Sequence, residues 1–173
     1  MKPQGHLVAS AALGGICWAG SRNPGALLTS LAFGVLLDLD HLIDYWYAER
    51  RLPRDLDDFR SGRYFVRSGR LFVLFHGYEY LPLLYLGWRA LRGRQAALVA
   101  VGAVLLHLLA DQLVNYLKPL GYFVSYRVAH RFRTADIIDW DKRERLRPVR
   151  LERAQRVREG AASGCDRVLG VFS

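Results

Sequence analysis

The 173-residue chain has few of the residues and motifs from which an activity is usually recognised. It contains only two cysteines, Cys17 in an apolar segment and Cys165 in a polar one. We therefore expect two free thiols rather than a redox pair. The chain has no Gly-x-x-x-x-Gly-Lys phosphate loop, no Gly-x-Ser-x-Gly nucleophile elbow and no dinucleotide-binding fingerprint. Internal repeats are also absent, so the common nucleotide-dependent and serine-hydrolase chemistries find little support.

Acidic residues are scarce relative to basic ones, with 16 Asp and Glu against 25 Lys and Arg and a net charge of +9. A nucleic-acid partner is not expected, because the basic residues flank apolar segments and no DNA- or RNA-binding module is present. Residues 49–70 and 126–159 hold most of the charge. Most of the aliphatic and aromatic side chains lie in residues 7–20, 25–47, 71–91 and 96–117. The chain therefore alternates between apolar segments and strongly charged segments.

Three of the apolar segments are long enough to cross the roughly 30 Å hydrocarbon layer of a membrane as helices, and residues 7–20 would cross tilted or only in part. Residues 96–106 lack the alternation of polar and apolar side chains that is typical of a soluble amphipathic helix. The alternative is a soluble bundle whose buried helices are apolar all round. We predict an all-α polytopic membrane bundle of about four transmembrane helices, with a basic cytoplasmic loop and C-terminal tail.

Proline and arginine placement refines this prediction. Asn23 and Pro24 are typical of a helix start, and Pro82 predicts a bend inside the third helix, where it would free the carbonyl of Tyr78. If the four helices cross in turn, one side receives Lys2, the loop 49–70 with its seven arginines and the basic tail. The positive-inside rule then places both termini in the cytoplasm.

We expect residues 1–125 to form the helical bundle that carries a polar site, and residues 126–173 to form a basic cytoplasmic or interfacial tail. Within that tail, residues 141–159 are expected to be a charged helix or partly disordered. An alternative for the N-terminus is a short signal peptide, whose removal would discard His6.

The apolar segments contain histidines and acids, which are costly to place in hydrocarbon. These residues are His6, Asp38, Asp40, His41, His76, Glu79, His107 and Asp111. In four helices of alternating direction, all of them would lie within about 16 Å of the cytoplasmic side. Three pairs are spaced so that both members lie on one helical face. They are Asp38 and His41, three residues apart; His76 and Glu79, also three apart; and His107 and Asp111, four apart.

Small residues continue these faces at four-residue steps. The stripes are His6, Ser10 and Gly14; Ala26, Ser30, Gly34 and Asp38; and Ala103, His107, Asp111 and Asn115. Small residues let membrane helices approach closely, so the polar side chains are expected in the bundle interior. Buried acids and histidines at one level indicate either a cation or mutual pairing, and a mixed nitrogen and oxygen set suits zinc, manganese or iron. The alternative is a hydrogen-bonded network without metal, or a proton path.

Several of these motifs resemble those of a known family. The N-terminal His6, the run Asp38-Leu39-Asp40-His41, the later His76 and the pattern His107-Leu108-Leu109-Ala110-Asp111 resemble the bacterial inner-membrane family of LexA-regulated, membrane-bound metal-dependent hydrolases. That family is similar in motif style to the all-helical zinc-dependent phospholipases C. The resemblance covers residues 5–115.

Two positions depart from the family pattern. The family usually has a proline where this chain has Leu37, and a His-Arg-Gly-x-x-His element where this chain reads His76-Gly77-Tyr78-Glu79-Tyr80. Only the first histidine of that element matches, so Glu79 stands near the place of the missing ligand.

The resemblance implies a multi-pass protein of the bacterial inner membrane with metal-dependent hydrolase activity. The predicted ligands of a divalent cation, zinc or else manganese or iron, are His6, Asp38, Asp40, His41, His76, His107 and Asp111. Glu79 and Asp40 are the predicted catalytic carboxylates, with Glu79 as the general base. Arg67 and Arg70 are candidates to hold an anionic headgroup, and plain topogenic charge is the alternative.

The expected substrate is a phosphoester or ester of an amphiphilic, lipid-like molecule that enters from the cytoplasmic leaflet. A lipid or lipid-linked substrate and the membrane itself are the expected partners. The alternative function is that of a non-catalytic membrane protein, such as an accessory subunit or small transporter, with a buried His/Asp network.

Overall fold

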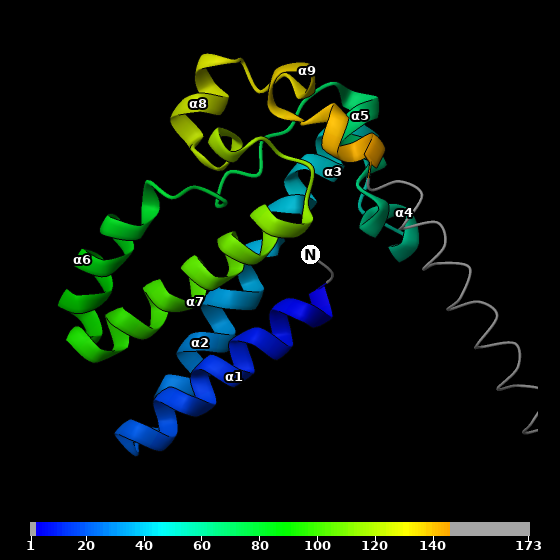
Figure 1. The fold of residues 1–173 in the computed structure, drawn as a ribbon. Coiled ribbons are helices and arrows are strands. Elements are labelled where there is room, and N and C mark those ends of the chain that lie inside the picture. Colours follow the sequence, from blue (N-terminus) through cyan, green and yellow to red (C-terminus); the bar gives the residue numbers. More distant parts are fainter. Residues whose placement is uncertain (1–2, 146–173) are drawn as a thin grey trace, which may run out of the picture. The chain divides into compact units, whose positions relative to one another are not determined.

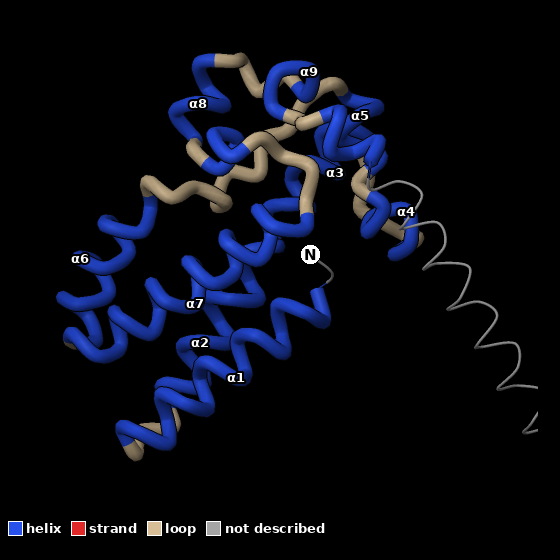
Figure 2. The backbone as a smooth tube through the Cα atoms, viewed as in Figure 1, coloured by secondary structure: helices blue, strands red, loops and turns tan. Residues whose placement is uncertain are grey.

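The computed structural model describes residues 3–145, and in that range the chain is helical and contains no strand (Figure 2). Two isolated backbone bridges, Arg70 to Arg133 and Leu117 to Ile138, are the only extended pairings among residues 3–145. Residues up to Ile138 belong to one compact unit, and a second unit begins at Asp139. The prediction of an all-α protein is confirmed for the described part of the chain.

Figure 1 shows the helices of this unit. They are α1 (Pro3–Ser21), α2 (Gly25–Val35), the 3-10 helix η1 (Leu36–Asp40), α3 (His41–Glu49), α4 (Leu56–Ser61), α5 (Arg63–Ser68), α6 (Tyr80–Arg92), α7 (Arg94–Val114), the 3-10 helix η2 (Pro119–Tyr122), α8 (Val124–Ala129) and α9 (Thr134–Ile137).

The four predicted apolar segments give the helices α1, α2, α6 and α7, which pack as a bundle. Helix α1 forms a hairpin with α2, α6 forms one with α7, and α7 also packs against both α1 and α2 (Figure 1). The buried residues of α1 are His6, Ser10 and Gly14, and those of α2 are Ala26, Ser30 and Gly34. These are the predicted small-residue stripes, and both are confirmed as the contact faces.

The hairpin of α1 and α2 depends on those small residues. A β-carbon added at Gly14 would lie 2.8 Å from the Cα of Leu27, so the two backbones are too close for any side chain there. The hydroxyl of Ser30 donates to the carbonyl oxygen of Ser10 at 2.7 Å, which ties the helices together at the same level. Close packing therefore brings the end of α2, which leads to Asp38, beside the N-terminal turns of α1.

Two of the described helical stretches, Gly25–Glu49 and Arg94–Val114, are long and apolar enough to cross a membrane. The first combines α2, η1 and α3. Its middle tightens into a 3-10 turn between Val35 and His41, which alters the angular placement of Asp38 and Asp40. A mid-helix 3-10 stretch often marks a functional position.

The predicted third helix is wrong over its first half. Residues 71–79 are not helical, and α6 begins only at Tyr80 and has 13 residues, which is about 20 Å. Pro82 consequently lies in the first turn, where no helical hydrogen bond is lost, and the carbonyl of Tyr78 accepts from the N–H of Leu81. The expected bend at Pro82 does not apply, because the helix starts just before it.

The remaining short elements cover the end of the bundle that holds η1 and the end of α7. We call residues 56–79 and 115–138 the covering segments; they include α4, α5, η2, α8 and α9 (Figure 1). Their apolar core consists of Leu71, Val73 and Ile137. Because that core reaches Ile137, the compact unit extends past the boundary expected at residue 125. The rest of the expected tail from residue 146 onward, with most of the stretch 141–159 and Cys165, lies outside the described residues.

Candidate metal centre

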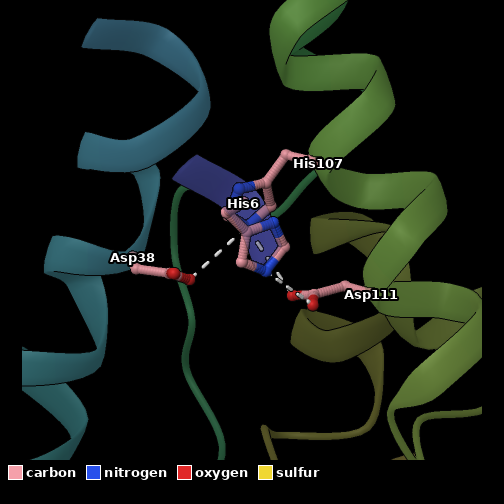
Figure 3. A group of neighbouring side chains, drawn as sticks. All are labelled: His6, Asp38, His107 and Asp111. Atoms are coloured by element: carbon pink, nitrogen blue, oxygen red, sulfur yellow. Dashed lines mark hydrogen bonds and ion pairs between the residues drawn. The ribbon is translucent and has the colours of Figure 1, made fainter. Parts of the chain in front are cut away.

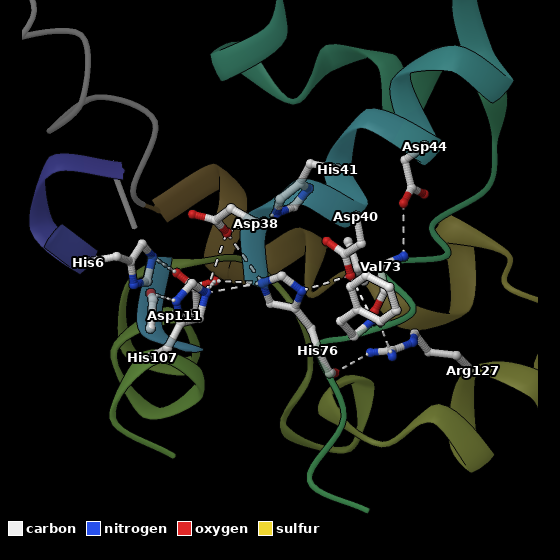
Figure 4. Close-up of polar contacts among 12 residues, drawn as sticks. His6, Asp38, Asp40, His41, Asp44, Val73, His76, His107, Asp111 and Arg127 are labelled. Carbon is white, nitrogen blue, oxygen red and sulfur yellow. Dashed lines mark hydrogen bonds and ion pairs between the residues drawn. The ribbon is translucent and has the colours of Figure 1, made fainter. Parts of the chain in front are cut away.

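The structure brings most of the predicted ligands together at the covered end of the bundle. His6 of α1, Asp38 of η1, and His107 and Asp111 of α7 have potential ligand atoms that all lie within 4.8 Å of one another (Figure 3). Asp38, His41 and His76 form a second such group that shares Asp38 with the first (Figure 4). All the predicted ligands except Asp40 therefore belong to one connected cluster.

Four atoms at its centre have the separations of a ligand sphere. The Nε2 atoms of His76 and His107 are 3.1 Å apart. Asp38 Oδ1 lies 3.4 Å from each of them, and Asp111 Oδ2 lies 3.7 and 3.6 Å from them. Zinc–ligand distances of about 2.0–2.2 Å correspond to tetrahedral edges of about 3.3–3.6 Å. These donors are spaced as the ligands of one small divalent cation would be.

Hydrogen bonds on the far side of the two rings determine which nitrogen carries the proton. His107 Nδ1 donates to the carbonyl oxygen of Gly34 at 2.8 Å, and His76 Nδ1 donates to Asp40 Oδ2 at 3.0 Å. In the neutral rings both Nε2 atoms therefore present lone pairs, and these face each other across the centre. Two such acceptors repel unless a cation or a proton lies between them. A metal-ligating histidine usually donates its other ring N–H to a carboxylate or a backbone carbonyl, as both of these rings do.

His6 lies on the buried side of the cluster, against Asp111 and His107. Its Nε2 lies 3.0 Å from Asp111 Oδ1, and its ring stacks on that of His107 with centroids 3.6 Å apart. Its Nδ1 is buried without a hydrogen-bond partner among the described residues. His6 therefore either binds the cation itself or orients Asp111 toward it.

His41 and Asp38 form the open side. Their side chains are 23% and 24% exposed, whereas His6, His76, His107 and Asp111 are at most 4% exposed. His41 Nε2 lies 3.5 Å from Asp38 Oδ1, and its Nδ1 lies 3.3 Å from the hydroxyl of Tyr64. These two side chains are therefore the cluster members most accessible to solvent.

Asp40 is fully buried but does not face the central donors. Its Oδ2 accepts from the N–H of Phe75 at 2.7 Å and from Nδ1 of His76, on the opposite edge of the ring from Nε2. Its place in the structure is that of a support for His76.

Glu79 directly precedes α6, and its carboxylate contacts the start of α8. Its carboxylate accepts from the backbone N–H groups of Val124 and Ser125 at 3.0 and 2.9 Å and from the Ser125 hydroxyl at 2.7 Å. Burial acts to raise the pKa of Glu79, but the hydrogen bonds from Ser125 outweigh it and hold that pKa below its usual value. The expected helical alignment of Glu79 with His76 is wrong, because residues 71–79 are not helical.

Arg67 and Arg70 make contacts within the covering segments and near α3. Arg67 Nη2 lies 2.6 Å from Glu49 Oε1 and 3.2 Å from Asp58 Oδ2, and the hydrogen bond from Arg67 holds the pKa of Asp58 below its usual value. Arg70 donates to the carbonyl oxygen of Arg131. Both guanidinium groups thus have structural partners.

Sequence reasoning missed two charged residues that hold the segment carrying His76. Asp44 accepts from the N–H groups of Phe72 and Val73 at 2.6 and 2.9 Å. Arg127, fully buried, donates to the carbonyls of Val73, His76 and Gly121 at 3.0, 2.9 and 2.7 Å. Asp44 could have been suspected as an acid inside an apolar segment, whereas nothing in the sequence distinguishes Arg127 from its basic neighbours.

Comparisons of the chain with protein-family models, with curated proteins and with solved structures find no match.

Proposed function

We propose that the protein is a membrane-embedded, metal-dependent hydrolase that cleaves a phosphoester or ester of an amphiphilic substrate. The observation that supports this most strongly is the facing pair of His76 Nε2 and His107 Nε2 at 3.1 Å, flanked by the carboxylates of Asp38 and Asp111. Nitrogen and carboxylate donors at these separations suit zinc, with manganese or iron as the next candidates. The motif resemblance to membrane-bound metal-dependent hydrolases agrees with this reaction class.

A divalent cation held by His76, His107, Asp38 and Asp111 would supply a more acidic water and polarise the scissile phosphoryl or acyl group. Asp40 and Gly34 keep the two imidazole rings in the tautomer that leaves Nε2 free. Asp40 therefore contributes through His76 rather than by direct contact with the substrate.

His41 is the best candidate for moving a proton during the reaction. It is the one cluster histidine with a partly exposed ring, and its Nε2 points to Asp38 on the open side. Tyr64 supports the ring from the other nitrogen. We prefer His41 to Glu79 for this role, because both carboxylate oxygens of Glu79 are already bound at the start of α8.

Exposed apolar side chains support a lipid environment for the bundle. Besides the two stretches that are long enough to span, α1 exposes Leu7, Val8 and Ile16, and α6 exposes Leu83, Leu86 and Leu91. Soluble monomers rarely expose large contiguous apolar patches. We propose that all four bundle helices face lipid, in a bacterial inner membrane with the metal-centre end toward the cytoplasm. A lipid or lipid-linked phosphate would then reach the open side of the cluster from the inner leaflet.

Metal analysis of the purified full-length protein in detergent tests the metal centre. After exposure to zinc, manganese or iron and extensive dialysis, we expect about one or two equivalents to be retained, and we expect His107→Ala and Asp111→Asn to lose them. The control is His130→Ala, which removes a histidine outside the cluster and should leave the metal content unchanged. The wild-type protein could instead fold normally without retaining metal, and both variants could fold as it does. That result would favour the non-catalytic accessory or transporter function.

Hydrolysis of a lipid extract tests the reaction. We expect metal-dependent release of a headgroup or acyl product that is lost in His107→Ala and retained in His130→Ala. Product release that survives chelation and the His107 substitution would contradict the proposal.

A further inference from the structure

The segment that carries His76 has a backbone conformation that its own sequence does not favour. Val73 has a φ of +33°. A β-branched residue with positive φ is a genuine outlier, because its side chain crowds the backbone in that region. His76 follows three residues later, and its backbone N–H bonds to the carbonyl of Val73. The direction of the His76 ring therefore depends on a strained residue that something else must hold.

Buried charged groups hold this segment from two sides (Figure 4). On the amide side, Asp44 binds the N–H of Phe72 and of Val73, and Asp40 binds the N–H of Phe75. On the carbonyl side, one nitrogen of the Arg127 guanidinium donates to Val73 and the other donates to His76.

Arg127 also joins this segment to a distant part of the chain. The nitrogen that binds the carbonyl of His76 donates to the carbonyl of Gly121 in η2 as well. The side chain is fully buried, and a buried guanidinium is tolerated only when its hydrogen bonds and neighbouring charges compensate it. Two of its three hydrogen bonds thus go to the carbonyls of Val73 and His76, at the two ends of the turn that carries the His76 ring.

We propose that Arg127 is a positioning residue of the metal centre: it holds Val73 in the positive-φ conformation and so aims Nε2 of His76 at His107. This inference rests on the proposed function, because it concerns the metal affinity of that same site. Without the guanidinium fork, Val73 relaxes toward negative φ and the His76 ring turns away from the other donors.

The test measures zinc affinity of the full-length protein in detergent by competition with a chromophoric chelator. We expect Arg127→Met to weaken zinc binding about 10- to 100-fold, the range found when groups that support metal ligands are removed. Arg127→Lys keeps the charge but lacks the planar guanidinium group, so its zinc affinity should lie between those of the wild type and Arg127→Met. Arg131→Met, which removes an exposed arginine nearby, should bind zinc as the wild type does.

Substitutions at Val73 separate positioning from general stability. Glycine adopts positive φ without strain, so Val73→Gly should restore most of the zinc affinity in the Arg127→Met background. Val73→Ala removes the outer methyl groups but keeps the β-carbon, and it should not restore affinity. Thermal unfolding in excess chelator reports the metal-free stability of each variant separately.

The possible failures are distinguishable. Wild-type affinity in Arg127→Met, or equal affinities of the glycine and alanine double variants, would overturn the positioning role while leaving the metal site intact. If Arg127→Met does not fold, Arg127→Lys decides the question, and wild-type affinity in that variant would overturn the inference. A wild-type protein that binds no zinc, manganese or iron refutes the proposed function itself.

Discussion

The bundle helices and the covering segments each contribute to the same cluster, but they place their side chains by different means. In the bundle, His6, His107 and Asp111 lie on helical faces whose other members are small or apolar, and close helix packing sets their positions. In the covering segments, His76 lies on an irregular stretch that donates hydrogen bonds to Asp44 and accepts them from Arg127. The bundle residues of the cluster thus depend on repeated weak contacts, whereas His76 depends on a few charged groups.

This difference predicts different sensitivities to substitution. Packing along α1, α2 and α7 is shared among many contacts, so one substitution removes a limited part of it. In the covering segments, the N–H groups of Phe72 and Val73 both depend on a single carboxylate, that of Asp44 in α3. Loss of that carboxylate leaves both donors without a partner, and an unsatisfied buried donor costs more than the net gain from an ordinary hydrogen bond.

The largest effect on stability is expected for Asp44→Ala. The substitution leaves the N–H groups of Phe72 and Val73 without an acceptor. This loss should lower the free energy of unfolding by about 2–4 kcal/mol. Asp44→Asn keeps one accepting oxygen and should lose less. Denaturant titration in detergent measures both, with the exposed Asp57→Ala as the control. An Asp44→Ala variant as stable as the Asp57→Ala variant would show that the covering segment does not depend on this carboxylate.

A smaller effect is expected in the bundle for Gly14→Ala. The added β-carbon would meet the Cα of Leu27 at 2.8 Å, and moving two helix backbones apart should cost about 1–3 kcal/mol. Gly15→Ala is the matched control, since a β-carbon there meets nothing within 4 Å. We expect that control to be neutral, or stabilising by about 1 kcal/mol or less. Equal unfolding free energies of the two variants would argue against close contact between α1 and α2.

The smallest effect is expected for Arg67→Ala, whose partners Glu49 and Asp58 lie near the surface. Because Arg67 holds the pKa of Asp58 below the unfolded value of 3.8, their pairing stabilises the fold at neutral pH. That contribution disappears as the pH falls through the lowered pKa. The melting temperatures of wild type and variant should therefore differ slightly at pH 7, and this difference should shrink as the pH falls below about 4. A difference that grows in acid would contradict the sign of this linkage.

Arg67→Ala also tests the expected headgroup contact. If Arg67 serves only the pairs with Glu49 and Asp58, hydrolysis of anionic and zwitterionic lipids should fall to the same extent in the variant. A selective loss with anionic lipids would instead support the predicted role in substrate binding.

Sequence reasoning succeeded where a regular period connects residues. The four-residue steps of His6, Ser10 and Gly14, and of His107 and Asp111, correctly identified buried faces, because a helix aligns such positions whatever surrounds it. It failed at residues 71–79. An apolar run without a period is compatible with a buried helix or with a buried loop, so His76 and Glu79 were assigned to a helical face that does not exist.

Composition and periodicity by themselves determined that this chain is helical, that its apolar helices pack through small residues, and that histidines and aspartates lie on the packed faces. These properties follow from interactions between residues a few positions apart. Only the tertiary structure decided that His76 joins the cluster from an irregular segment, that Glu79 binds the start of α8, and that Arg127 is buried beside His76. Those outcomes depend on which distant backbone groups need a hydrogen-bond partner once water is excluded, and no local pattern records that requirement.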